Sequence, residues 1–345
     1  MARSPDPRPR RALRLAAGTA LATAAGFGLA LPIPFIAPML TLFLLARSNR
    51  PLPLRAIVGL PVLVAVTTSS GLLIIPLLQY ASFTGVLLIG LALFGCFRYM
   101  LRGGNALLAT FAVVGLTMIS AAGTSSFALA LTVIEALAKG LLIAGLIASV
   151  SHWVFPESPI VAAAAAPTVE TPIDAAWIAL RATLVVLPAF LLALIDPSAY
   201  MPLIMKSVTL GQQACTTLAR DAARELLGAT LLGGLLAIAF WSALTVFPHL
   251  WMFFLWMLLF ALLVGRKLYV LSATRLSPGF WLNTLSTLIL LLGQSVQDSA
   301  AGKDVYTAFA VRMSLFVAVT LYACAMIYLI DNRRDRRKAI RAQPA

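Results

Sequence analysis

Residues 56–78 read AIVGLPVLVAVTTSSGLLIIPLL, a stretch without a charged side chain that begins directly after Arg55. About 20 apolar residues are enough for a helix to cross the hydrocarbon core of a bilayer. Similar stretches recur along the chain, which is 61% hydrophobic and 11% charged and has a mean hydropathy of +0.96. In soluble domains roughly 45–50% of the residues are hydrophobic and about 25% are charged. The sequence therefore predicts a polytopic membrane protein.

The apolar stretches are typical of helices, because they are rich in Leu, Ala and Gly and lack the two-residue alternation of barrel strands. Charged or proline-containing turns divide the 345 residues into about twelve such segments. We expect an all-α fold with transmembrane helices at 13–31, 35–46, 56–78, 80–97, 106–122, 127–150, 176–195, 202–214, 226–247, 250–265, 280–294 and 308–330.

Positive charges fall almost entirely on one side of these segments. With the N-terminus inside, both tails and the basic loops lie on the inner side, and Lys303 is the clear exception. This pattern predicts that both termini are cytoplasmic. The net charge of +14 does not predict nucleic-acid binding, because no basic domain with interleaved aromatic residues is present.

The two halves of the chain share one plan. Arg55 and Gly59 recur as Arg224 and Gly228, and the triplet ALR at 12–14 recurs at 179–181. Any two halves that obey the positive-inside rule would place some arginines alike, but the short second segment is shared as well. We predict two parallel six-helix repeats. The domains are a basic tail (1–12), a first half (13–151), a linker rich in Pro and Ala (152–175), a second half (176–330) and a basic tail (331–345).

The short second segment of each half carries prolines: Pro34 and Pro38 in the first half, Pro197 and Pro202 in the second. Interrupted helices at matching positions point to a transporter binding site, because the freed backbone groups need a cavity or a polar partner. The alternative is an ordinary tight hairpin with proline at a helix start.

Charges inside apolar segments are the other candidates for a binding site, since each costs roughly 2.5–3.5 kcal/mol at the centre of a helix. Lys206 is followed by Gln212 and Gln213, and with Lys139 and Arg312 these residues are predicted to bind substrate. Glu135 is the candidate for proton coupling. Two alternatives remain: Glu135 and Lys139 at i, i+4 could form a structural ion pair, and Arg312 could reach the outer interface.

Enzymatic function is not expected, since no catalytic motif occurs in a suitable context. The glycine-rich run 228–234 lies in an apolar segment and indicates helix packing instead of a phosphate loop. Three distant cysteines and two isolated histidines indicate no metal site and no cofactor.

Residues 10–44, RRALRLAAGTALATAAGFGLALPIPFIAPMLTLFL, and residues 220–237, RDAARELLGATLLGGLLA, resemble the fusaric-acid-resistance-like (FUSC) and aromatic acid exporter superfamily. The compact chain is most similar to the DUF2955 branch. This resemblance implies a bacterial inner-membrane exporter of small organic, often aromatic, acids. It also implies a periplasmic adaptor of the membrane-fusion type and an outer-membrane channel as partners, and a basic anion path that Lys206, Arg312 and Arg181 would fit.

The sequence thus predicts a proton-coupled exporter of small organic anions that alternates access between two halves. One alternative is a major-facilitator-type permease, although loop 47–51 lacks the acidic–basic glycine motif usual there. The other is a membrane scaffold that docks an adaptor without transporting anything. Membrane lipids are expected to surround the protein in each case.

Overall fold

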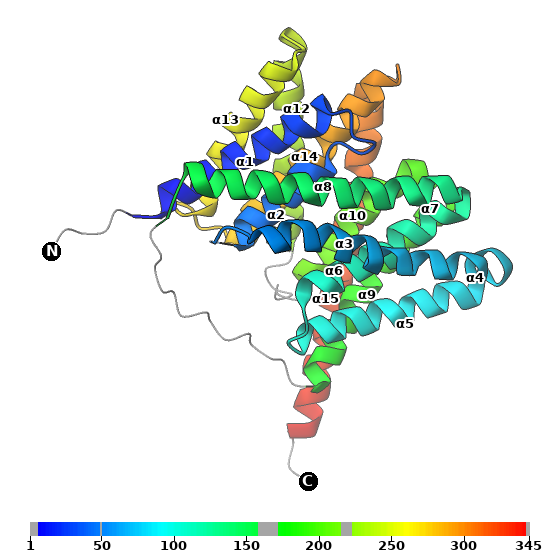
Figure 1. The fold of residues 1–345 in the computed structure, drawn as a ribbon. Helices are drawn as coiled ribbons and strands as arrows, with labels where there is room; N and C mark the ends of the chain where they lie inside the picture. Colours follow the sequence, from blue (N-terminus) through cyan, green and yellow to red (C-terminus); the bar gives the residue numbers. More distant parts are fainter. Residues whose placement is uncertain (1–5, 49, 158–171, 215–222, 343–345) are drawn as a thin grey trace. The chain divides into compact units, whose positions relative to one another are not determined.

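The computed structural model describes residues 6–48, 50–157, 172–214 and 223–342, and all regular structure within these ranges is helical (Figure 1). The elements are α1 (Arg8–Gly28), α2 (Ile36–Arg47), α3 (Leu54–Ser69), η1 (Ser70–Ile74), α4 (Ile75–Tyr80), α5 (Ser82–Leu101), α6 (Ala106–Val114), η2 (Gly115–Ile119), α7 (Ser120–Ser125), α8 (Phe127–Val154), α9 (Pro172–Ile195), α10 (Pro197–Ala214), η3 (Ala223–Leu227), α12 (Gly228–Val246), α13 (Leu250–Leu268), α14 (Pro278–Ala300) and α15 (Val305–Ala342).

Nine helical stretches within the described ranges are long and apolar enough to cross a membrane. They are Leu54–Tyr80, Ser82–Leu101, Ala106–Ser125, Phe127–Val154, Asp174–Ile195, Arg224–Val246, Leu250–Leu268, Pro278–Ala300 and Val305–Asn332. The prediction of an all-helical, multi-pass membrane protein is confirmed for these parts of the chain. Helices α1, α2 and α10 occupy the three remaining predicted segments, and the count of twelve stays a prediction.

Two helix starts are fixed by side chains that the sequence places directly before an apolar run. The Asn105 side chain accepts hydrogen bonds from the N–H groups of Leu107 and Leu108, at 3.0 and 3.3 Å, where α6 begins. The Ser277 hydroxyl accepts from the Phe280 N–H at 3.2 Å, where α14 begins. Such caps satisfy N–H groups that have no partner within the helix.

The end of α14 differs from the sequence prediction, which ended this segment at residue 294. The structure continues α14 to Ala300. Gly302 then takes a φ of +69°, and the Lys303 N–H donates to the Asp298 carbonyl at 2.9 Å, the ending that glycine favours after a helix. The prediction was wrong because Ser295 and Asp298 are buried side chains within the helix.

The chain forms two compact units, each built from separated segments. Unit 1 comprises Met1–Ala65, Glu135–Ala164 and Ala229–Val311, and unit 2 comprises Val66–Ile134, Ala165–Gly228 and Arg312–Ala345. In unit 1, α1 packs on α2 and α13, and α14 packs on α2 and α13. In unit 2, α9 packs on α10 and α5, and the continuous α6–η2–α7 segment packs on α5 and α10.

Close helix contacts in both units depend on glycine. In unit 1 a Cβ on Gly233 would lie 2.7 Å from the Thr284 carbonyl oxygen, so α12 and α14 pack closely at this glycine of the run 228–234. In unit 2 a Cβ on Gly71 would lie 2.0 Å from the Gly115 carbonyl oxygen, and one on Gly115 would lie 2.6 Å from Thr68 Cα. Glycine thus lets two irregular segments, the 3₁₀ turn η1 and the π-helix η2, meet backbone to backbone.

Candidate functional site

The side chain of Lys206 is fully buried midway along α10, inside unit 2. The neighbouring Ser207 and Thr209 are buried as well. A cationic side chain at membrane depth is costly, so it is usually found where polar groups or a water-filled cavity receive it. The burial of Lys206 among hydroxyl-bearing residues makes α10 the strongest candidate for a binding element.

The helix segment packed on α10 is irregular where it is most polar. η2 is a π-helix, and Thr117 within it and Ser120 directly after it are both fully buried. Both η2 and α7, which carries Ser120, contact α10. Short π-segments inside α-helices occur frequently at functional sites. Two helical segments with buried hydroxyl groups therefore pack on each other in the interior of unit 2.

The hydroxyl groups of this interior donate to carbonyls of their own helices. Each bond reaches back four residues at 2.6–2.7 Å: Ser207 to Leu203, Thr209 to Met205 and Thr117 to Val113. Such bonds satisfy the hydroxyl proton while the oxygen keeps acceptor capacity. A hydroxyl can also rotate and donate to a bound anion instead, so these groups suit a site that is alternately empty and occupied.

Both glutamines predicted to bind substrate lie on α10. The Gln212 amide donates to the Thr110 hydroxyl at 2.9 Å, which ties α10 to α6 within unit 2. Gln213 is half-buried. Lys206, Thr209 and Gln213 are spaced i, i+3 and i+7, which places them on one face of the helix. The structure therefore brings three of these polar groups into one line.

The other charged candidates lie elsewhere. Glu135 and Lys139 form an ion pair with each other on an exposed face of α8, within unit 1, and their side chains are 50% and 55% exposed. Arg312 is half-buried in α15, at the start of a segment of unit 2. The sequence left open whether Glu135 and Lys139 form a structural ion pair, and the structure shows this i, i+4 pair. The roles of these three residues in transport stay predictions.

The four prolines stand near the starts of short helices. Pro34 precedes α2, Pro38 lies in its first turn, and Pro197 is the first residue of α10. Pro202 lies inside α10, which continues across it. Both helices continue across their inner prolines, Pro38 and Pro202, and Pro202 does not stand at a helix start as the hairpin alternative expected.

Sequence reasoning missed a buried ion-pair cluster at the end of unit 1 that is predicted to face the cytoplasm. Arg14 of α1 is 1% exposed, and both of its terminal nitrogens lie 3.4 Å from one carboxylate oxygen of Glu157. Arg11 donates to the other oxygen through Nε at 2.8 Å. Burial alone would raise the pKa of Glu157, but the hydrogen bonds and charges of Arg11 and Arg14 outweigh it and hold this pKa below its ordinary value.

A second buried arginine, in unit 2, pairs with a carboxylate in a similar way. Arg181 of α9 is 4% exposed, and its Nη1 donates to both carboxylate oxygens of Asp331 in α15, at 2.7 and 2.6 Å. The signal in the sequence was an arginine inside the first apolar segment of each half and an acid just after the last one. That spacing alone does not distinguish a buried pair from ordinary charges at the membrane interface.

Helix α14 carries a further buried polar face that the sequence analysis did not assign. Asn283, Thr287, Gln294, Ser295 and Asp298 are each at most 8% exposed. Their helical spacing was the signal in the sequence for a buried helix face. The predicted segment nevertheless ended at residue 294, before Ser295 and Asp298. Asp298 is thus a buried carboxylate within a helix long and apolar enough to cross a membrane.

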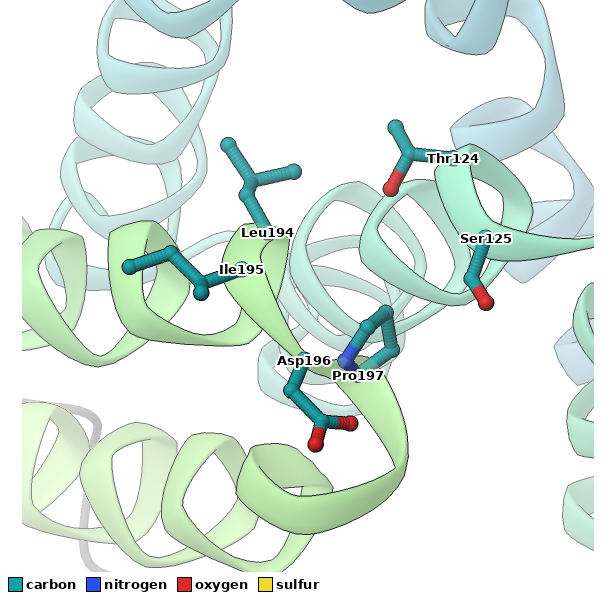
Figure 2. Close-up of a pocket in the computed structure, with 6 residues that line it drawn as sticks. All are labelled: Thr124, Ser125, Leu194, Ile195, Asp196 and Pro197. Atoms are coloured by element: carbon teal, nitrogen blue, oxygen red, sulfur yellow. The ribbon is translucent and has the colours of Figure 1, made fainter.

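A hollow of about 380 Å³ opens in unit 2 beside the turn between α9 and α10 (Figure 2). It is lined by Thr124 and Ser125 from the end of α7, by Leu194 and Ile195 from α9, and by Asp196 and Pro197 from the turn. The Asp196 carboxylate accepts a hydrogen bond from the Ala199 N–H at 3.1 Å. The hollow therefore lies at the start of α10, the helix that carries Lys206.

Comparison with known protein families finds one match. Residues 11–151 match the family described as "Protein of unknown function (DUF2955)". No curated protein and no solved structure matches the chain. The resemblance to DUF2955 is thus confirmed for this segment, and the wider link to the FUSC superfamily stays a prediction.

The matched segment and the candidate site overlap only in part. Residues 11–151 include Arg14, the Glu135–Lys139 pair and the π-helix η2. Lys206 and the rest of α10 lie beyond the match. The family similarity therefore covers η2 and α7 but not α10, on which they pack.

Proposed function

We propose that this chain is a bacterial inner-membrane exporter of small organic acids, in which Lys206 binds the carboxylate of the substrate. The observation that carries the proposal is a fully buried lysine on a helix that also carries the buried hydroxyls of Ser207 and Thr209 and the amide of Gln213. A cation beside neutral hydrogen-bonding groups complements a monovalent anion. The sequence resemblance to aromatic acid exporters narrows this class to carboxylates, aromatic ones included.

We also propose that the chain is a duplication of parallel six-helix halves, with twelve spans and both termini inside. In unit 1, α1 packs on α2 and α13; in unit 2 their predicted counterparts, α9, α10 and α5, pack in the same way. Arg14 and Arg181, equivalent in the predicted repeat, are each buried against a carboxylate that follows the last predicted segment of their half. The family match ends at residue 151, the last residue of the predicted first half.

Export is proposed to be driven by protons moving inward as the anion moves outward, with alternating access to the site. A periplasmic membrane-fusion adaptor and an outer-membrane channel would carry the acid beyond the periplasm. Support for these partners comes from the sequence resemblance alone. Transport by the purified chain and adaptor dependence in cells are therefore separate experiments.

The test is transport by the purified protein in liposomes, with labelled benzoate, salicylate and malate as probes and choline as the cationic comparison. We expect saturable transport of at least one carboxylate and none of choline. Lys206→Met should reduce carboxylate transport at least tenfold, because the positive charge is lost while the length and the apolar stem are kept. Lys303→Met, at an exposed lysine of the loop after α14, is the matched control and should leave transport unchanged.

Folding of the variant can be checked independently. Thermal melting of Lys206→Met beside the wild type shows whether the variant is folded. A folded Lys206→Met variant that transports at the wild-type rate would remove the lysine from the site. A wild-type protein that transports none of the carboxylates would contradict the export function and favour the scaffold.

A further inference from the structure

We propose that Arg11 and Arg14 of α1 form a binding site for a small carboxylate anion within unit 1, and that Glu157 of the same chain occupies this site as an internal ligand. The site lies at the end of unit 1 that is predicted to face the cytoplasm. It is separate from Lys206, and anion binding there does not depend on the proposed transport. A cytoplasmic acid competes with Glu157 for the same two guanidinium groups.

Each oxygen of the Glu157 carboxylate has an arginine of its own. Arg11 donates to Oε1 through Nε at 2.8 Å and also through Nη2. Both terminal nitrogens of Arg14 lie 3.4 Å from Oε2. The planar guanidinium fork matches the geometry of a carboxylate, which is why arginine is favoured where proteins recognise carboxylate groups. The carboxylate of a free acid would therefore meet the same donors as Glu157.

Arg14 is incompletely satisfied by its internal ligand. Charge-assisted bonds between nitrogen and a carboxylate oxygen are about 2.7–2.9 Å long, so both contacts at 3.4 Å are loose. The Nε atom of Arg14 is buried and has no hydrogen-bond partner among the described residues. The side chain is 1% exposed, and a buried charge without full compensation is costly. A free carboxylate has no backbone tether and can approach this guanidinium more closely than Glu157 does.

The charges around the site favour a further anion. The two arginines face one carboxylate, which leaves one positive charge in excess. Arg10 adds a cation on the same helix, and α13, which packs on α1, carries Arg266 and Lys267 in its last turn. Asp6, just before α1, pairs with Arg8, and both of these side chains are more than half exposed. This end of unit 1 therefore attracts anions from solvent.

The arginines belong to a packed helix, whereas the carboxylate does not. Both arginines stand on α1, which packs on α2 and α13. Glu157 follows α8, which ends at Val154, and lies outside any regular element. Arg10 holds the residue before it, by donating from Nη1 to the Pro156 carbonyl at 3.0 Å. Displacement of Glu157 thus breaks contacts of a non-helical segment and leaves α1 in place. The Arg11 side chain is 25% exposed, so an anion reaches the site from solvent at this residue.

The buried ion pair of unit 2 differs from this site in each respect. One arginine, Arg181, meets one carboxylate, that of Asp331, so their charges balance. The two bonds are short, at 2.7 and 2.6 Å, and Asp331 lies within the helix α15. Such a pair suits a structural role. The loose contacts, the excess charge and the non-helical carboxylate distinguish the site in unit 1 as one whose occupant can be exchanged.

Calorimetric titration of the purified full-length chain with benzoate tests the site. Lys206→Met serves as the parent protein, so that the proposed transport site does not contribute. Glu157→Ala removes the internal ligand, which competes at a high effective concentration, and should tighten benzoate binding at least about tenfold. Adding Arg14→Met should abolish this gain. Asp6→Ala, which removes the carboxylate of the exposed pair with Arg8, is the matched control and should leave the affinity of the parent unchanged.

Benzamide and inorganic phosphate define the ligand class, and neither should gain affinity in Glu157→Ala. Glu157→Gln removes the charge while keeping the size of the side chain, and it should show a gain for benzoate in the same direction even where Glu157→Ala does not fold. Equal benzoate affinity in the parent and the Glu157 variants, or a gain that survives Arg14→Met, would overturn the inference. A gain for phosphate in place of benzoate would overturn the assignment to carboxylates. Because Lys206 is absent from all of these proteins, failure of the wild type to transport an acid would refute the proposed function alone.

Discussion

The Arg181–Asp331 ion pair of unit 2 offers a stability test of the duplicated architecture. Arg181 is 4% exposed, and the Asp331 side chain is 18% exposed. Asp331→Leu removes the carboxylate while keeping a side chain of similar size. The guanidinium would then be buried without the two hydrogen bonds of 2.7 and 2.6 Å that it now donates from Nη1 to Asp331.

The expected loss follows from the geometry. Breaking a buried ion pair by removing one partner costs about 3–5 kcal/mol, mostly because the remaining charge is uncompensated. Because Asp331 is partly exposed, the cost for this pair should lie at the lower end of that range. We therefore expect a loss of about 3 kcal/mol in the free energy of unfolding. Titration with SDS in mixed micelles, followed by the fluorescence of the six tryptophans, measures this difference.

A double replacement separates the charge from the packing. Arg181→Leu/Asp331→Leu replaces the pair with apolar side chains and should recover most of the loss, because such replacements are often neutral or stabilising. The exposed pair Arg8–Asp6, at 3.9 Å, is the matched control, and Asp6→Leu should cost no more than about 0.5 kcal/mol. A loss below 1 kcal/mol for Asp331→Leu, or a double variant as unstable as the single one, would refute the reasoning.

Two further predictions concern the inner cluster of unit 1 and the π-helix of unit 2. Because the folded-state pKa of Glu157 is lowered, the stability that its charge contributes should be complete above the unfolded value near 4.5 and should disappear as the pH falls through the folded value. The stability difference between wild type and Glu157→Gln should therefore be constant from pH 6 to 8 and shrink below pH 4.5; a difference that grows toward acid would contradict the ion-pair geometry. Gly115→Ala should destabilise by about 1–3 kcal/mol through overpacking, since its Cβ would lie 2.6 Å from Thr68 Cα, whereas Gly59→Ala, with open space around it, should be neutral or slightly stabilising. Equal melting temperatures for these two glycine variants would show that η1 and η2 do not meet as closely as described.

The apolar segments were predictable because hydropathy and charge act locally along the chain. A run such as 56–78 excludes charge over the length of a span, and a helix forms there with α3, η1 and α4. The irregular turns within that helix were not predictable, because they depend on the approach of Gly115, more than forty residues away in the sequence. Local composition specifies the span, while the crossing of two spans determines where the helix departs from α geometry.

The candidate site shows the same division between local and distant information. Lys206 was identifiable from sequence alone, because a lysine within an apolar run is costly wherever the helix lies. Its burial, and the failure of Glu135 to be buried, depend on which face of each helix turns inward, and i, i+4 spacing cannot decide that for a helix that is apolar on most sides.

Asp298 shows where such reasoning can be extended. A loop and a buried polar helix face both contain polar residues, but in a helix they recur every three or four positions and leave apolar residues between them. Asn283, Thr287, Gln294 and Asp298 follow that spacing, and the leucines at 290–292 separate them. In a lipid-spanning helix this spacing has a physical cause, because backbone and side-chain polar groups must face protein or water. Polar residues at helical spacing near the end of an apolar segment therefore predict a buried polar face of a helix as readily as they predict a loop.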